Sequence, residues 1–82
     1  MIAFLDGKII SKSPLAIVIE VQGVGYLVHV SLPTFYGLPE IGAKISIRIY
    51  TVVREDEIKL FGFSSELEQI VFENLIAISK VG

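Results

Sequence analysis

The chain has 82 residues, no cysteine, and a formal net charge of −2 from 7 Lys and Arg against 9 Asp and Glu. This length allows one small domain with a fragment of a second, and the lack of cysteine excludes a disulfide-stapled fold and a cysteine-based zinc site. Hydrophobic residues make up 52% of the sequence, which excludes disorder, and the acidic balance argues against a sequence-blind nucleic-acid binder, whose affinity usually comes from a basic face.

The apolar content exceeds what one small core can bury. Part of it is therefore expected to meet another surface, either a partner subunit or a further part of the same chain. The apolar runs are too short to span a membrane, and the N-terminus lacks the basic region and long apolar run of a signal peptide. We expect a cytoplasmic protein with no membrane partner.

The first two thirds of the chain have the pattern of strands joined by turns. Ile2 to Ile10 is rich in β-forming residues, and Gly7 inside it marks a bend or a close backbone approach. Ser11 to Pro14 is a turn cluster. Apolar residues alternate from Leu15 to Val21, and Gln22-Gly23 favours a tight turn into the next strand.

That next strand is predicted from Val24 to Val30. Ser31 to Pro39 holds two prolines, a glycine and two aromatics, which favours a loop with one short helical turn. A turn at Glu40 to Gly42 precedes a strongly alternating strand from Lys44 to Val53, with its isoleucines pointing inward. A last strand runs from Ile58 to Phe63.

The final third of the chain changes to a helical period. Ser65-Glu66-Leu67-Glu68 matches the S-x-x-E capping box, and two apolar stripes follow at helical spacing. One stripe contains Leu67, Ile70, Val71, Leu75 and Ile78, and the other contains Phe72 and Ile76. A helix that is apolar on two sides indicates a missing neighbour, so we expect the chain to be cut after Gly82.

Five short strands with regular turn spacing predict a small closed barrel. Closure removes exposed strand edges, and the OB-fold is the commonest barrel of this size. The predicted fold is therefore mainly β: a five- to six-stranded OB-fold β-barrel followed by one α-helix.

No constellation in the sequence builds a catalytic site. His29 is the only histidine, and although Ser31 lies near it there is no nucleophile elbow, so a half-exposed strand histidine is the better interpretation. One histidine with scattered carboxylates does not make a metal site. Gly23-Val24-Gly25 lacks the third glycine of a dinucleotide loop and leads into a strand, which favours a turn. We expect no catalytic residue, no metal and no cofactor.

The cluster Arg54-Glu55-Asp56-Glu57 lies at the predicted tip of a projecting β-hairpin, and two interpretations stay open. It is an ordinary solvated turn, since turns are usually polar, or an acidic spike that repels an anionic partner. Three carboxylates at one tip repel each other and contribute little to the fold. One tip is a weak barrier, but several tips gathered by oligomer symmetry would be a strong one.

Six short runs, taken together, carry a resemblance to a known family. They are Gly23-Val24-Gly25-Tyr26, Val28-His29-Val30, Thr34-Phe35-Tyr36, Leu38-Pro39, Val52-Val53-Arg54-Glu55-Asp56 and Phe61-Gly62-Phe63. In this order and spacing, from Met1 to Gly82, the chain resembles the RuvA family, the bacterial Holliday-junction-binding subunits of the branch-migration complex.

The resemblance implies two domains: an OB-fold barrel with tetramer contacts over residues 1–63, and over residues 64–82 the first helix and start of a truncated helix-hairpin-helix domain. It implies a non-catalytic DNA-binding subunit of recombination, DNA repair and the SOS response to DNA damage. Such a subunit holds a four-way junction open for a motor ATPase. The implied partners are four-way junction DNA, three further copies in a homotetramer, a RuvB-type hexameric motor bound through a C-terminal domain, and a junction resolvase.

The resemblance also implies site residues. Glu55 and Asp56 would form an acidic pin at the junction centre, with Arg54 contacting DNA beside it and Glu57 adding a third carboxylate outside the family positions. Ser79-Lys80-Val81-Gly82 would begin the DNA-binding hairpin, with Lys80 where the family usually has glycine. Because the rest of that hairpin is absent, we expect the chain alone to bind DNA poorly.

Two other functions stay open. A generic OB-fold module would bind single-stranded nucleic acid by stacking bases on Tyr26, Tyr50 and Phe61. Little positive charge accompanies these aromatics, so core or interface packing is the favoured interpretation. The third possibility is a pure oligomerisation domain with no ligand.

Overall fold

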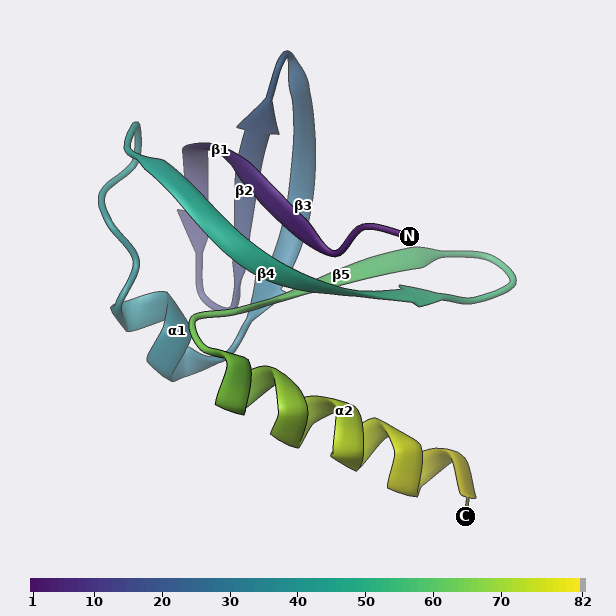
Figure 1. Cartoon of the computed structure of the whole chain (residues 1–82). Coiled ribbons are helices and arrows are strands. Elements are labelled where there is room, and N and C mark those ends of the chain that lie inside the picture. The colour runs from purple at the N-terminus through teal and green to yellow at the C-terminus, as the bar shows by residue number, and fades with distance from the viewer. Residues whose placement is uncertain (82) are drawn as a thin grey trace.

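A computed structural model describes the backbone of residues 1–81 and the side chains of residues 1–78. Over that part of the chain, five strands form a closed barrel and a long helix runs away from it (Figure 1). The elements are β1 (Phe4–Ser13), β2 (Ala16–Val21), β3 (Val24–Val30), α1 (Leu32–Tyr36), β4 (Lys44–Val53), β5 (Ile58–Phe63) and α2 (Glu66–Val81). The predicted fold class, a mainly β barrel followed by one helix, is confirmed.

The barrel closes in the order β1-β2-β3-β5-β4, with β4 returning to β1. Neighbouring strands are antiparallel, except that β3 and β5 are parallel. A parallel pair cannot be joined by a tight turn, and here the chain passes through α1 and β4 between the two strands. Phe35 of α1 and Leu38 after it pack against the core, so α1 closes one end of the barrel.

Alternating apolar side chains from the five strands fill the barrel. In β4 the inward positions Ile47 and Ile49 are buried, as predicted from the alternation, while Arg48 between them is exposed. The buried hydrophobic residues are Leu5, Ile9, Ile17, Ile19, Val28, Val30, Ile47, Ile49, Leu60 and Phe63.

Two features of the first three strands need glycine. Gln22 and Gly23 have φ of 49° and 90°, the two positive values of a type I′ hairpin turn, which confirms the predicted turn. At Gly7 the backbone of β2 approaches so closely that a Cβ atom would lie 2.3 Å from the carbonyl oxygen of Glu20. The predicted close backbone approach at Gly7 is therefore confirmed.

The turn predicted over Ser11 to Pro14 was wrong in extent. β1 continues to Ser13, and a register shift between Ile9 and Ser11 marks an irregularity in its pairing with β2. Lys12 pairs with Ile17 and Ser13 with Ala16, so the turn itself is confined to Pro14 and the residue after it. Cross-strand pairing outweighs the local turn preference of serine, as sheet context usually does.

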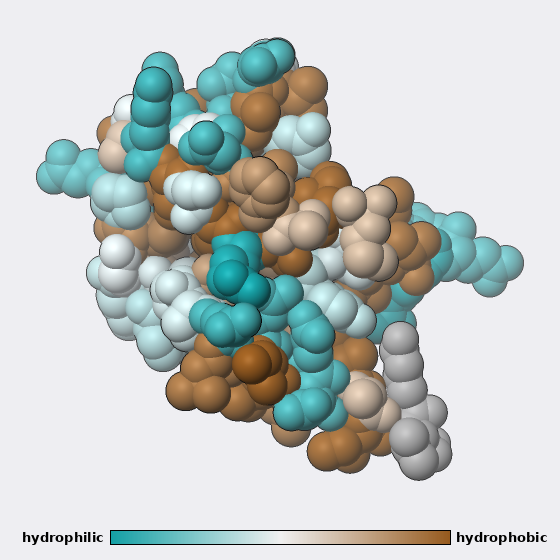
Figure 2. All heavy atoms as spheres, in the orientation of Figure 1, coloured by the Kyte–Doolittle hydropathy of each residue, from teal (hydrophilic) through white to brown (hydrophobic). Residues whose placement is uncertain are grey.

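The helix α2 begins as predicted, and the shorter of its two apolar stripes, which contains Phe72, faces the barrel. The Glu68 N–H donates to Ser65 Oγ at 3.1 Å, so Ser65 caps the helix. Phe72 contacts the barrel, and its ring centroid lies 4.9 Å from that of Phe61 and 5.1 Å from that of Phe63. The larger predicted stripe is exposed: Leu67, Ile70, Val71, Leu75 and Ile78. Figure 2 shows this apolar surface interrupted by polar side chains.

Candidate functional site

The β4–β5 hairpin projects beyond the barrel and carries the acidic cluster at its tip (Figure 1). Strand pairing continues as far as Val53 and Ile58, and the Arg54 N–H donates to the Glu57 carbonyl oxygen at 2.9 Å. This bond closes a tight turn, with the side chains of all four tip residues exposed. The structure therefore brings Arg54, Glu55, Asp56 and Glu57 together, as the sequence predicts.

The tip carries three carboxylates and one guanidinium group, so its net charge is negative. Among residues 1–78 the ion pair that forms is Arg48 with Glu66 at 3.8 Å, and none joins Arg54 to the tip carboxylates. Below the tip, Val53 and Ile58 are 66% and 68% exposed. An exposed negative tip on an extended arm repels anions.

The other predicted binding residues are Ser79, Lys80, Val81 and Gly82. The side chains of the first three, and the whole of Gly82, lie outside the described part of the chain. Their assignment to the start of a DNA-binding hairpin therefore stays a prediction.

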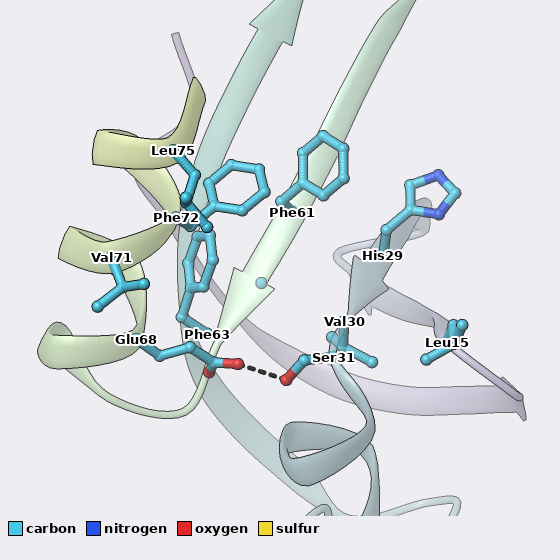
Figure 3. Close-up of a pocket in the computed structure, with 11 residues that line it drawn as sticks. Leu15, His29, Val30, Ser31, Phe61, Phe63, Glu68, Val71, Phe72 and Leu75 are labelled. Atoms are coloured by element: carbon cyan, nitrogen blue, oxygen red, sulfur yellow. Dashed lines mark hydrogen bonds between the residues drawn. The ribbon is translucent and has the colours of Figure 1, made fainter. Parts of the chain in front are cut away.

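A groove of about 440 Å³ lies between α2 and the parallel strands β3 and β5 (Figure 3). It is mainly apolar, with the Phe61 ring 5.6 Å from His29 and 4.9 Å from Phe72, measured between centroids. His29 is half-buried against Phe61, which confirms the interpretation of a partly exposed strand histidine. No cluster of three or more His, Cys, Asp or Glu side chains that could hold a metal occurs within the described residues.

The aromatic residues considered for base stacking are packed within the protein. Tyr50 and Phe61 both contact Phe72, with centroid distances of 5.8 and 4.9 Å. Tyr26 is half-buried and packs on the barrel core. The favoured packing interpretation is confirmed, and these rings do not form an open stacking platform.

The sequence pattern missed a polar cluster centred on Glu68 (Figure 3). One carboxylate oxygen, Oε1, accepts from Thr34 Oγ1 at 2.6 Å and from the Ser64 N–H at 3.2 Å, and Oε2 accepts from the Ser31 hydroxyl. In a capping box this carboxylate would return to the N–H of Ser65, the capping residue itself. Ser65 and Glu68 are visible as a motif, but nothing local to them indicates that Ser31 and Thr34 lie alongside.

The hydrogen bonds at Glu68 change its ionisation. Partial burial raises the pKa of this carboxyl group, but the bonds from Ser31, Thr34 and Ser64 to the charged form outweigh that effect and lower the pKa below its ordinary value. A lowered pKa in the folded state adds stability above the ordinary pKa, and this stability is lost as the pH falls through the folded value.

The variant Glu68→Gln should therefore melt at a lower temperature than the wild type at neutral pH, and the gap should close in acid. The closure is expected as the pH falls below 4.5, the ordinary glutamate value, toward the lowered one. Thermal melts followed by circular dichroism at stepped pH would measure it. A gap that stays constant from neutral pH to about pH 3 would contradict the assignment, because both states would then bind the proton equally.

Within the described residues, no helix is long and apolar enough to cross a membrane.

The chain is similar in sequence to known proteins. The family model described as the RuvA N terminal domain matches residues 1–62. The chain is 48% identical over all 82 residues to a protein of Geobacter sp. (strain M21), 49% identical to one of Geobacter sulfurreducens, and 44% identical to one of Solibacter usitatus. Each relative is named Holliday junction branch migration complex subunit RuvA. The chain covers 41 to 42% of the length of these relatives.

Proposed function

Because this chain belongs to the RuvA N-terminal domain family, we propose that it is the barrel of a subunit that binds Holliday junctions in a branch-migration complex. In this proposal residues 1–63 are an OB-fold domain that makes tetramer contacts. Residues 64–82 are the first helix and the start of a helix-hairpin-helix domain.

The proposed mechanism rests on one observation. An exposed acidic tip lies at the end of a projecting hairpin, in a chain whose relatives are named for a DNA junction. Carboxylates do not attract DNA, so the tip acts by repulsion. A phosphate about 8 Å from one carboxylate is repelled by about 0.5 kcal/mol in water, and by about 2 kcal/mol at an effective dielectric constant near 20. In a tetramer with its tips at one centre, Glu55 and Asp56 of each copy add to this repulsion.

The subunit is a non-catalytic DNA holder in recombination and repair. Backbone-binding groups that begin at Ser79-Lys80-Val81-Gly82, at the end of α2, and continue in the chain that follows hold the four arms of the junction. The acidic pins keep phosphates apart at the crossover, and Arg54 contacts DNA beside them. A hexameric motor ATPase of the RuvB type, bound to a part of the subunit beyond this chain, draws duplex through the open junction. A junction resolvase would act on the same DNA.

The exposed apolar surface supports the oligomeric part of the proposal. Phe4 on β1 is 64% exposed, and Val24 and Leu27 on β3 are 51% and 54% exposed. Large apolar side chains exposed on barrel strands are available for contacts with further copies, as the proposed tetramer requires. A generic single-strand binder is less well supported, because Tyr50 and Phe61 pack on Phe72.

The proposal predicts how DNA binding divides between this chain and a protein of the relatives' length. A full-length protein that contains the chain should bind a four-way junction more tightly than linear duplex or single strands of equal length. The 82-residue chain should bind the junction on the order of a thousandfold more weakly, because most phosphate-binding groups lie beyond it. Fluorescence anisotropy with labelled DNA at one fixed salt concentration measures both. Equal junction affinity of the two proteins, or a preference for single strands, would refute the proposal.

A further inference from the structure

The carboxylate of Glu68 joins three segments that meet at the base of α2. Its oxygens accept from Thr34 Oγ1 at 2.6 Å and from the hydroxyl of Ser31, on the α1 side, and from Ser64 N–H at 3.2 Å in the link between β5 and α2. Thr34 is 1% exposed, so its hydroxyl is fixed within the barrel end. Figure 3 shows the Glu68 side chain reaching from α2 to Ser31 beside β3.

Ser31 also organises α1. Its Oγ accepts from the Thr34 N–H at 3.3 Å and caps the short helix, while the same hydroxyl donates to Glu68. Hydrogen bonding therefore runs from the backbone of α1 through Ser31 to the first turn of α2. Ser31 directly follows β3 and Thr34 is buried, so this connection joins the first turn of α2 to the barrel itself.

The other contacts of α2 with the barrel constrain its direction less. Phe72 packs among Phe61, Phe63 and Tyr50, but apolar packing is not directional, so a helix can tilt about one ring with little loss. Two further polar contacts of α2 in the described part of the chain, from Arg48 to Gln69 at 2.8 Å and from Arg48 to Glu66 at 3.8 Å, are exposed. Exposed contacts of this kind contribute little to stability. Several directional bonds to one part-buried carboxylate, in contrast, fix the orientation of the helix that carries it.

A small change of tilt at the base of α2 is amplified along the helix. The helix has 16 residues and is therefore about 24 Å long. A tilt of about 10° at its first turn moves its far end by about 4 Å. In the full-length relatives a further part of the chain follows α2, so its placement relative to the acidic tip depends on this angle.

We propose that Glu68 is a positioning residue that sets the direction of α2 relative to the barrel, through its bonds to Ser31, Thr34 and Ser64. It thereby fixes the distance between the acidic tip of the β4–β5 hairpin and the DNA-holding region beyond α2. The second statement rests on the proposed function, whereas the first does not involve DNA.

The absence of cysteine makes the angle measurable on this chain. Spin labels on the double variant Ser46→Cys and Asn74→Cys, one exposed site on β4 and one on α2, report a distance distribution by pulsed electron paramagnetic resonance. With Glu68 present we expect a narrow distribution. Adding Glu68→Ala should broaden it by about 2 Å, because Asn74 lies about halfway along α2 and a tilt of about 10° moves that point half as far as the helix end. Adding Glu68→Gln, which keeps one carbonyl acceptor, should give an intermediate width.

Glu66→Ala is the matched control, because Glu66 lies in the same helical turn and makes the exposed contact with Arg48. It should leave the distribution unchanged. If Glu68→Ala does not fold, the distance distribution is measured in Glu68→Gln instead, at a temperature where circular dichroism shows a folded barrel. A lowered melting temperature with the wild-type distribution would show a merely structural role and overturn the inference. Failure of the wild-type full-length protein to bind junctions would instead refute the proposed function and leave the distance result intact.

Discussion

Gly7→Ala is expected to destabilise the barrel by about 3 kcal/mol, the upper end of the usual cost of over-packing, because the new methyl group would meet backbone atoms. The new Cβ would lie 2.3 Å from the Glu20 carbonyl oxygen and 2.8 Å from a methyl group of Val21. The carbonyl is part of β2, so relief requires the two strands to separate. An 82-residue domain has a total stability of about 4 to 12 kcal/mol, so the variant should lose about a quarter to three quarters of it.

Gly37→Ala is the control for this prediction. A Cβ atom there would lie 3.6 Å from the Pro33 carbonyl oxygen, an ordinary contact, at a residue whose φ is −88°. Chemical denaturation followed by circular dichroism compares the two variants with the wild type. Equal midpoints for Gly7→Ala and the wild type would show that β1 and β2 do not approach at Gly7 as the structure has them.

The double variant Glu55→Gln and Asp56→Asn, in a full-length protein that contains this chain, is expected to bind a four-way junction about tenfold more tightly or better. Each carboxylate removes about 0.5 to 2 kcal/mol of binding free energy per nearby phosphate, and about 1.4 kcal/mol corresponds to tenfold in affinity. The tighter central contact should also alter the rate of branch migration, because the crossover strands are no longer kept apart.

Both tip side chains are exposed and the turn is closed by backbone atoms, so this double variant should fold and melt like the wild type. Glu40→Gln in the α1–β4 loop removes an exposed carboxylate far along the chain from the tip and is the matched control for charge. It should leave junction affinity and migration rate unchanged. Unaltered affinity and rate in the double variant would remove the basis for a pin.

Most of the fold could be predicted because local pattern and tertiary environment agree. Val24–Val30, Lys44–Val53 and Ile58–Phe63 have the predicted bounds. The first two alternate between a more buried and a more exposed face, and the third is bounded by the polar tip residues and by Ser64. The end of β1 could not be predicted, because Ser11 to Ser13 is held in the sheet by pairing with β2 and not by its own preference. Short-range patterns contain no information on such distant pairings.

The candidate site, too, can be predicted only in part from the sequence. The acidic tip lies within four consecutive residues, so its charge and its place between two strands are visible in the sequence. Glu68 was recognised only as half of a capping box, because its partners Ser31 and Thr34 are 37 and 34 residues away. The barrel-facing side of α2 was also ambiguous: Phe72 alone contacts three aromatic residues, while the longer apolar stripe is exposed.

In the proposed function, the acidic tip acts on DNA by electrostatic repulsion. The most direct test is the ratio of junction affinity between the Glu55→Gln, Asp56→Asn variant and the wild type, measured at rising salt concentrations in the full-length protein. Screening shortens the range of repulsion from about 10 Å at 0.1 M salt to about 3 Å at 1 M. The ratio should therefore be well above one at low salt and fall toward one as salt is added. A ratio of one at every salt concentration, or a ratio that rises with salt, would contradict electrostatic repulsion by the tip.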